Sequence, residues 1–303
     1  MRSSPPATLR SLLSLRRIQP AAVVPLPATT QFSRELTAEL STLLATSGEH
    51  GIPQLLDAAI ATQKLALNTL SHVSYAADVD LRALEEYLET NTNILDACNY
   101  FVERIEDTKK HYVDSLRNVA RWVESGATSR ALEQLESCHD TEKRLKAMGK
   151  RGLRRTMLRQ KLVHETEFSE IVCGSRAMAL LCCMFLEHSL SFDCSKGGFL
   201  MMKCQGHPMS CSWLRLMHEL AEESGEKKKR GCLVMETVSA ARELKEQIKG
   251  KRGKEIVESC VERMKRSCRE LEGGLDFIEG KVRDLYKSLI DVRMALLGIL
   301  SQA

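Results

Sequence analysis

One stretch of the sequence decides the fold: residues 257–299, VESCVERMKRSCRELEGGLDFIEGKVRDLYKSLIDVRMALLGI. Apolar residues recur in it at intervals that alternate between four and three, which keeps one narrow stripe of a helix apolar. The positions are Val257, Val261, Met264, Cys268, Leu271, Leu275, Ile278, Val282, Leu285, Leu289, Val292, Leu296 and Ile299. At 1.5 Å per residue, the pattern predicts a helix about 65 Å long that faces a partner along its length.

A second stretch, residues 81–123, shows the same alternating spacing. Its positions are Leu81, Leu84, Leu88, Asn91, Leu95, Cys98, Val102, Ile105, Lys109, Tyr112, Leu116, Val119 and Val123. Two of them, Asn91 and Lys109, are polar. We expect Asn91 to face water where the helix leaves its partner; the alternative is a buried Asn that fixes the register of pairing. Because the two stretches have matching lengths, we expect the two helices to pair.

Shorter helical segments account for most of the remaining chain. Leu, Ala, Glu, Lys and Arg dominate the sequence, which favours helix over strand. The predicted segments are 34–47, 52–73, 128–148, 153–191, 210–223 and 232–249. We expect Asp78 and Ser210 to cap two of the helices and the pair Gly273–Gly274 to bend the last one. The sequence therefore predicts an all-α, elongated helical bundle with two long heptad-patterned helices, 81–123 and 257–299, in a single domain, 35–303.

The first 34 residues differ from the rest of the chain in charge. They contain five arginines, and no acidic residue precedes Glu35. This composition is typical of an organelle transit peptide, and a disordered basic tail is the alternative. We expect an intracellular protein, with plastid or mitochondrial targeting and a cytosolic or membrane-associated location both left open. Without these arginines the chain carries 39 basic and 40 acidic residues, which argues against nucleic acid as a partner.

The sequence also predicts a Gly/Cys-rich loop at 193–209. Four residues in or beside it are candidate zinc ligands: Cys194, Cys204, His207 and Cys211. Structural zinc sites pair two close couples of ligands across a longer loop, whereas these residues form one loose group. The chain has eleven cysteines at irregular spacing, so we expect reduced thiols and no bound metal or cofactor.

A basic segment followed by an apolar helix raises the question of membrane contact. The segment 150–161 contains six basic residues and no acidic one, which makes them candidates for contact with lipid: Lys150, Arg151, Arg154, Arg155, Arg159 and Lys161. The apolar helix that follows, 171–192, has an uninterrupted apolar run of only ten residues, whereas a membrane span needs about twenty. We expect a buried bundle helix; peripheral contact with an anionic membrane surface is the alternative.

Four apolar residues near the end of the chain are candidates for contact with a partner protein through a helical seam: Leu285, Leu289, Val292 and Leu296. The alternative is that these residues pack inside the monomer. A substitution of Leu289 by Asp should unfold the chain if the seam is internal, whereas it should abolish only assembly if the seam is an interface.

The segment EEYLETNTNILDACNYFVERIE, residues 85–106, resembles the YLD-x-S-x-x-LLD-x-C-x-x-x-x-x-EL stretch of BYPASS-related plant proteins. The matching positions are Tyr87, Leu88, Ile94, Leu95, Asp96 and Cys98. The basic linker with its apolar helix at 150–190 and the ending at 269–300, with its Leu-Glu-x-Gly-Leu core at 271–275, are also similar to that family.

The resemblance implies a role in plant root and shoot development, where the family is associated with restraint of a root-derived mobile signal. No catalytic residues are established for the family, so none is carried over. Our hypothesis is a non-enzymatic helical interaction or regulatory protein. The alternatives are a peripheral membrane protein that uses 150–161 and 171–192, and an enzyme that acts on a small signal precursor.

Overall fold

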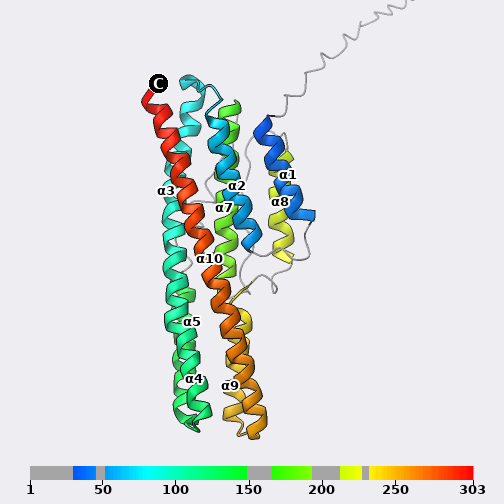
Figure 1. Ribbon diagram of the computed structural model, residues 1–303, viewed down its shortest axis with the longest axis vertical. Coiled ribbons are helices and arrows are strands. Elements are labelled where there is room, and N and C mark those ends of the chain that lie inside the picture. Colours follow the sequence, from blue (N-terminus) through cyan, green and yellow to red (C-terminus); the bar gives the residue numbers. More distant parts are fainter. Residues whose placement is uncertain (1–29, 46–51, 149–165, 193–211, 227–231, 303) are drawn as a thin grey trace, which may run out of the picture.

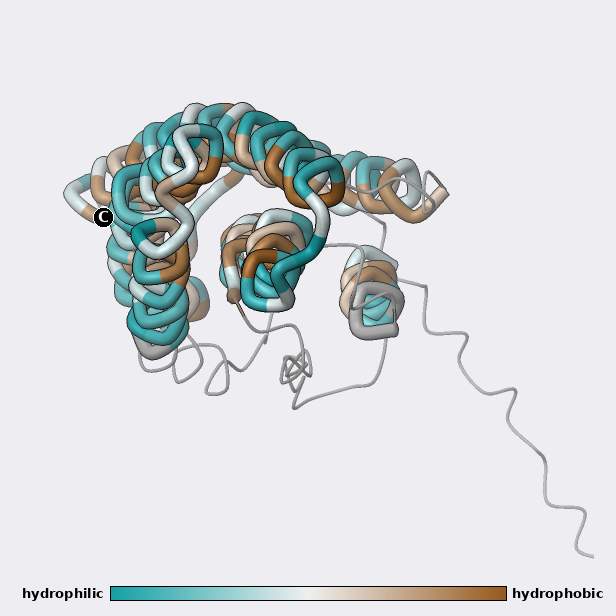
Figure 2. The backbone as a smooth tube through the Cα atoms, turned by 90° about the horizontal axis from the view of Figure 1, so that it is seen from below, coloured by the Kyte–Doolittle hydropathy of each residue, from teal (hydrophilic) through white to brown (hydrophobic). Residues whose placement is uncertain are grey.

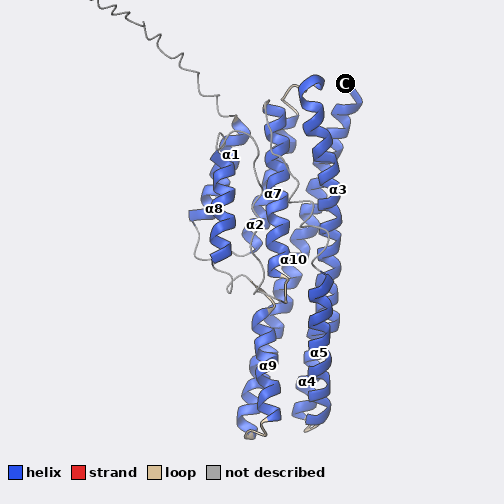
Figure 3. Ribbon diagram, turned by 180° about the vertical axis from the view of Figure 1, so that it is seen from behind, coloured by secondary structure: helices blue, strands red, loops and turns tan. Residues whose placement is uncertain are grey.

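The computed structural model describes residues 30–45, 52–148, 166–192, 212–226 and 232–302. Every regular element within these ranges is helical, as Figure 3 shows, so the predicted all-α class is confirmed. The elements are α1 (Gln31–Ala45), α2 (Ile52–Leu70), α3 (Ala77–Asp107), the π-helical turn η1 (Thr108–Val113), α4 (Asp114–Glu124), α5 (Thr128–Met148), α7 (Glu167–Ser189), α8 (Ser212–Glu226), α9 (Met235–Lys249) and α10 (Lys254–Gln302). Figure 1 shows them arranged as an elongated bundle.

Helix α10 runs along almost the whole bundle and packs against α2, α3, η1, α4 and α9 (Figure 1). Its 49 residues continue through Gly273 and Gly274 without a break. The structure gives Gly274 a packing role, because Leu233 lies 3.0 Å from the point where a Cβ atom would stand. All of the apolar positions predicted for this helix are buried except the two at the ends, Val257 and Ile299, which are half-buried.

Helix α3, η1 and α4 together form the second long rod, which runs antiparallel to α10 (Figure 1). The sequence does not reveal η1, a turn in which one extra residue changes which side chains face inward. Thr108, Tyr112 and Val113 are buried there, and Lys109 is only partly exposed. The expectation that Asn91 faces water is wrong: the side chain is buried, and its amide donates to the Leu289 carbonyl of α10.

The N-terminus of α3 is held by Asp80 and not by Asp78. Asp78 is exposed in the first helical turn, and the N-cap residue Ala76 makes no side-chain capping bond. The buried carboxylate of Asp80 accepts the Ala76 backbone N–H at 2.9 Å and also accepts the Thr166 hydroxyl. Thr166 in turn caps α7, so one carboxylate joins the starts of two helices. The predicted cap Ser210 lies outside the described residues.

Helix α1 begins at Gln31, inside the segment 1–34 that the sequence analysis assigned to the arm. The hydroxyl of Thr30 accepts the Ser33 backbone N–H at 3.0 Å and so caps the helix. Phe32 is fully buried, and its ring lies so close to Gly174 of α7 that a Cβ atom on that glycine would be 2.6 Å from it. Packing of this aromatic ring therefore extends the helix toward the N-terminus.

Helix α7 lies inside the bundle, in contact with α1, α2, α3 and α8. Nearly all of its side chains are buried, including Ser175, whose hydroxyl donates to Gln63 of α2 at 2.6 Å. Its C-terminal carbonyl at Leu190 accepts a bond of 2.9 Å from the buried guanidinium of Arg104, a favourable place for a cation. In Figure 2 hydrophobic and hydrophilic residues alternate around the helices, as expected when apolar sides turn toward neighbouring helices.

Candidate functional site

The four residues that the sequence singled out for a partner seam lie in the core of the monomer. Leu285, Leu289 and Leu296 are fully buried, and Val292 is 1% exposed. Their side chains are covered by the helices that pack against α10, which is the internal alternative that the sequence analysis left open. A partner therefore cannot reach these four side chains while the bundle is intact.

The other candidates from the sequence fall outside the described residues. The possible metal ligands Cys194, Cys204, His207 and Cys211 belong to 193–211, and the basic residues from Lys150 to Lys161 belong to 149–165. Within the ranges that are described, no group of three or more His, Cys, Asp and Glu side chains could hold a metal ion.

Helix α7 contains the apolar stretch for which membrane contact was considered. Of the helices that the structure describes, it is the one that is long and apolar enough to cross a membrane. However, 89% of its most apolar window is buried inside the bundle, as in the core helix of a soluble protein. The apolar side chains of α7 are thus already in contact with protein.

Two polar contacts align α3 with α10 near the C-terminal end of α10. The amide nitrogen of Asn91 donates to the Leu289 carbonyl at 3.4 Å, and the Arg293 guanidinium donates to the Leu88 carbonyl at 2.7 Å and to the Thr92 hydroxyl at 3.1 Å. Because each bond joins a side chain of one helix to a fixed group of the other, a shift of one helix along the other would break both. Asn91 thus has the register-fixing position that the sequence analysis gave as its alternative.

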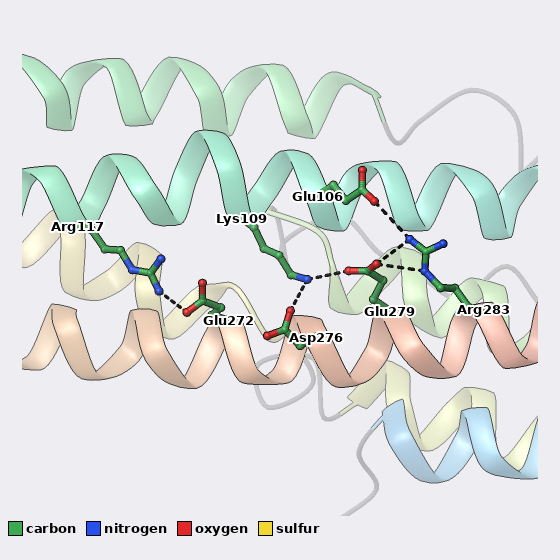
Figure 4. Close-up of polar contacts among 7 residues, drawn as sticks. All are labelled: Glu106, Lys109, Arg117, Glu272, Asp276, Glu279 and Arg283. Atoms are coloured by element: carbon green, nitrogen blue, oxygen red, sulfur yellow. Dashed lines mark hydrogen bonds and ion pairs between the residues drawn. The ribbon is translucent and has the colours of Figure 1, made fainter.

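A row of charged residues continues the alignment toward the other end of the rod (Figure 4). Lys109 of η1 lies 2.5 Å from the Asp276 carboxylate and 2.7 Å from that of Glu279. Burial disfavours the charge of Lys109, but the hydrogen bonds that its ammonium group donates to these two carboxylates outweigh this effect and raise the Lys109 pKa. The polar residue in the predicted seam is therefore neutralised by carboxylates of α10.

Arginines complete this row on both sides of Lys109. Arg283 lies 2.8 Å from Glu279 and 3.4 Å from Glu106, and Arg117 of α4 pairs with Glu272 (Figure 4). Hydrogen bonds from Lys109 and then Arg283 lower the pKa of Glu279, so this carboxylate is ionised at neutral pH. Lys109 and Glu279 are both partly buried, whereas each of the other pairs includes an exposed side chain and contributes little stability.

The described cysteines are free, buried thiols, and their surroundings make them poor nucleophiles. Burial raises the pKa of Cys138 to about 12, that of Cys173 to about 11 and that of Cys268 to about 12. A thiol reacts as its thiolate, and at neutral pH almost none is present at such values.

The buried carboxylates join helices to one another. Glu142 of α5 accepts the Tyr112 hydroxyl at 3.0 Å and the Arg242 guanidinium of α9 at 3.0 Å. Glu170 of α7 accepts the Thr30 hydroxyl at 2.7 Å. These bonds link segments that are far apart in the sequence, so the carboxylates stabilise the bundle.

Exposed apolar side chains gather where the start of α3 meets the end of α10. Met294 is 61% exposed, Leu81 40%, Leu300 38% and Leu297 36%. Residues three apart on a helix are neighbours, so Met294, Leu297 and Leu300 form one row. Since Leu88 contacts Arg293 and the helices are antiparallel, seven residues further along each brings Leu81 beside Leu300. We call these four residues the α3/α10 strip.

The sequence analysis missed the strip because its members on α10 fall between the seam positions. A signal was present: Met294, Leu297 and Leu300 are apolar, yet they lie outside the alternating four and three spacing that places residues in the core. An apolar row beside a complete seam indicates a second apolar side on the same helix.

A family model described as Protein BPS1 matches residues 58–299, which run from α2 almost to the end of α10. Neither the curated proteins nor the solved structures contain a match to this chain. The family match covers the two long rods, the charged row and most of the α3/α10 strip. On the strength of this match, the chain belongs to the BPS1 family, the BYPASS-related plant proteins that its sequence resembles.

Proposed function

We propose that this protein is a non-enzymatic helical interaction protein of plant development, and that it binds a partner protein through the α3/α10 strip. The observation that carries the proposal is the group of exposed side chains of Leu81, Met294, Leu297 and Leu300. Single exposed apolar residues are ordinary, whereas a contiguous apolar surface with polar surroundings is typical of an interaction site.

The position of the strip supports this assignment. It lies on two helices that are held in register by Arg293, which directly precedes Met294, and by Asn91, whose partner Leu289 lies five residues before Met294. A surface on rigid, aligned helices needs little ordering when a partner binds, which lowers the entropic cost of association. The strip is also on a different side of α10 from the buried seam, so a partner can bind without opening the bundle.

The chemistry of the described residues supports a role in binding more than one in catalysis. The buried thiols of Cys138, Cys173 and Cys268 are protonated at neutral pH. The buried carboxylates of Glu142 and Glu170 are hydrogen-bonded between helices. A catalytic centre needs convergent acid, base or nucleophilic groups at a place that a substrate can reach, and these groups are all engaged in the core.

Co-purification from plant cells tests the proposal. The tagged full chain would be compared with a double variant, Leu297→Ser with Leu300→Ser, and with the control Phe277→Ser. Phe277 is 48% exposed on the same helix but lies away from the strip, so it matches the loss of apolar surface without changing the site. Circular dichroism would establish that all three proteins are folded.

We expect specific proteins to accompany the wild type and Phe277→Ser but not the double variant. Recovery of the same proteins with all three chains would refute the strip as the binding surface. If no protein accompanies the wild type above the level of an unrelated tagged protein, even after chemical cross-linking, the interaction role itself is refuted.

A further inference from the structure

We infer that the partner segment bound by the α3/α10 strip is an amphipathic α-helix whose apolar side is flanked by Lys or Arg. This inference rests on the proposed function and adds the chemical class of the partner. It is carried by the charges that border the strip on both sides, which the apolar residues alone do not reveal.

Carboxylates border the strip along α3. Asp78 and Glu85 lie three residues before and four residues after Leu81, so both are its neighbours on the helix surface. Glu89 follows Glu85 by one further turn and lies on the same side. All three are exposed, and none forms an ion pair with another described residue. This edge of the strip is therefore negatively charged.

Another carboxylate borders the strip on α10. Asp291 lies three residues before Met294, is exposed and has no ion-pair partner within the described part of the chain. Because Met294 stands on the side of the row that faces away from α3, Asp291 lies across the strip from Glu85 and Glu89. The apolar surface is thus enclosed between two acidic edges.

Among the described residues, the cations near these edges do not balance the charge of the carboxylates. Arg293 donates to the Leu88 carbonyl and the Thr92 hydroxyl, Arg82 pairs with Glu86 at 3.1 Å, and Lys287 pairs with Asp284 at 3.3 Å. The two paired cations add no net charge with their partners. Arg293 keeps its positive charge because both of its acceptors are neutral, so the described residues around the strip carry four unpaired carboxylates against one unpaired cation.

The shape and charge of the strip together specify the partner. A row of apolar side chains about two helical turns long fits the i, i+3, i+4 and i+7 anchors of a helix laid along it. Unpaired carboxylates on both edges attract Lys and Arg that flank such anchors, and they repel an acidic helix. They also repel an anionic lipid surface, which favours a protein helix over a membrane at this site.

Two synthetic helical peptides of the same length test the inference with the full chain. Both carry Leu at the a and d heptad positions; the basic probe has Lys at e and g, and the acidic probe has Glu there. Binding of fluorescently labelled peptide would be measured by anisotropy at low and high salt. We expect the basic probe to bind at least about tenfold more tightly than the acidic probe, with a difference that shrinks at high salt.

Variants separate the charge from the apolar surface. Reversal of the edge, Glu85→Lys with Glu89→Lys, should remove the preference for the basic probe, and Leu297→Ser with Leu300→Ser should weaken both probes by about tenfold or more. The control Phe277→Ser should leave both affinities unchanged. Circular dichroism would verify that each variant is folded.

Equal binding of the two probes, or no binding of the basic probe, would overturn the inference. It would also be overturned if anionic vesicles bound the protein at the strip in place of the basic probe. Vesicle binding that is lost in the double variant, Leu297→Ser with Leu300→Ser, would show this. These outcomes differ from failure of the proposed function. If co-purification depends on the strip while the probes show no charge preference, only the charge class of the partner is wrong.

Discussion

Replacement of Leu289 by Ala, compared with the same replacement at Leu297, tests whether the long seam is internal to the monomer. The two leucines lie on the same helix, but Leu289 is fully buried and Leu297 is 36% exposed. Removing a buried Leu side chain loses its transfer free energy and leaves a cavity, which together cost about 3–5 kcal/mol. At Leu297 water or neighbouring side chains can fill the space, so only part of the transfer free energy is lost, about 1 kcal/mol.

Urea denaturation followed by far-UV circular dichroism would measure both free energies of unfolding. The comparison is valid if the dependence of the free energy on urea is the same for the variants and the wild type. Each protein would be measured at two concentrations about a hundredfold apart. If the seam were an interface between chains, the apparent free energy of unfolding would rise by about 2.7 kcal/mol over that range.

We expect Leu289→Ala to be less stable than Leu297→Ala by at least about 2 kcal/mol, with midpoints that do not depend on protein concentration. Equal effects of the two substitutions would refute the assignment of Leu289 to the core. A midpoint that rises with concentration for the wild type, and not for Leu289→Ala, would instead place the seam between two chains.

Three further predictions concern other parts of the bundle. Gly273→Ala should raise the free energy of unfolding by about 0.5–1 kcal/mol, because no described atom lies near the added methyl group. Gly274→Ala should raise the free energy of unfolding by less, because the Leu233 side chain beside the added methyl group must move. Equal stabilisation by the two substitutions in thermal melts would contradict this packing. The lowered pKa of Glu279 means that its ionised form stabilises the fold above the ordinary pKa of about 4.3 and that this contribution is lost as pH falls through the lower folded value. Glu279→Gln should therefore be less stable than the wild type at neutral pH, by an amount that shrinks below about pH 4, and a difference independent of pH would refute the role of the charge. Iodoacetamide should leave Cys138 and Cys173 unmodified in the native protein at about pH 8, because burial keeps both thiols protonated; mass spectrometry that finds them labelled as fast as in urea would show that the core opens readily.

The sequence predicts the parts of the fold that depend on apolar periodicity. The residues that alternate by four and three on α10 lie in the core, and α2, α5 and α9 fall close to their predicted ranges. Periodicity is a reliable guide here because a long helix buried along one side must repeat its apolar residues at nearly 3.5 positions.

Apolar periodicity does not predict contacts between segments that are far apart in the sequence. Asn91 lies on the stripe that faces α10, but its burial follows from the carbonyl of Leu289, which accepts its amide N–H and which the sequence does not reveal. The cap of α3 comes from Asp80 because Thr166 of another helix donates to the same carboxylate. Lys109 in the turn η1 pairs with two carboxylates of α10. In each case the deciding partner is more than seventy residues away in the chain.

The candidate site, too, was only partly predictable from apolar periodicity. The sequence led to Leu285, Leu289, Val292 and Leu296 because they continue the strongest pattern, yet the strength of that pattern reflects burial inside the monomer. The apolar row on α10 can be seen in the sequence, whereas its continuation to Leu81 is recognisable only when the start of α3 is known to lie beside the end of α10. Its acidic edges come from both helices, so no single segment of sequence contains the site.

The place of α10 in chain order has a consequence during synthesis. This helix follows all of its packing partners in the sequence, so the apolar sides of α2, α3 and α4 leave the ribosome before the helix that covers them. At about 5–20 residues per second, translation of its 49 residues takes roughly 2–10 s. During that interval the nascent chain exposes the surfaces that α10 will bury, and chaperones that recognise apolar segments have time to bind them. We therefore expect faster synthesis of α10 to shorten the time for which these apolar surfaces are exposed.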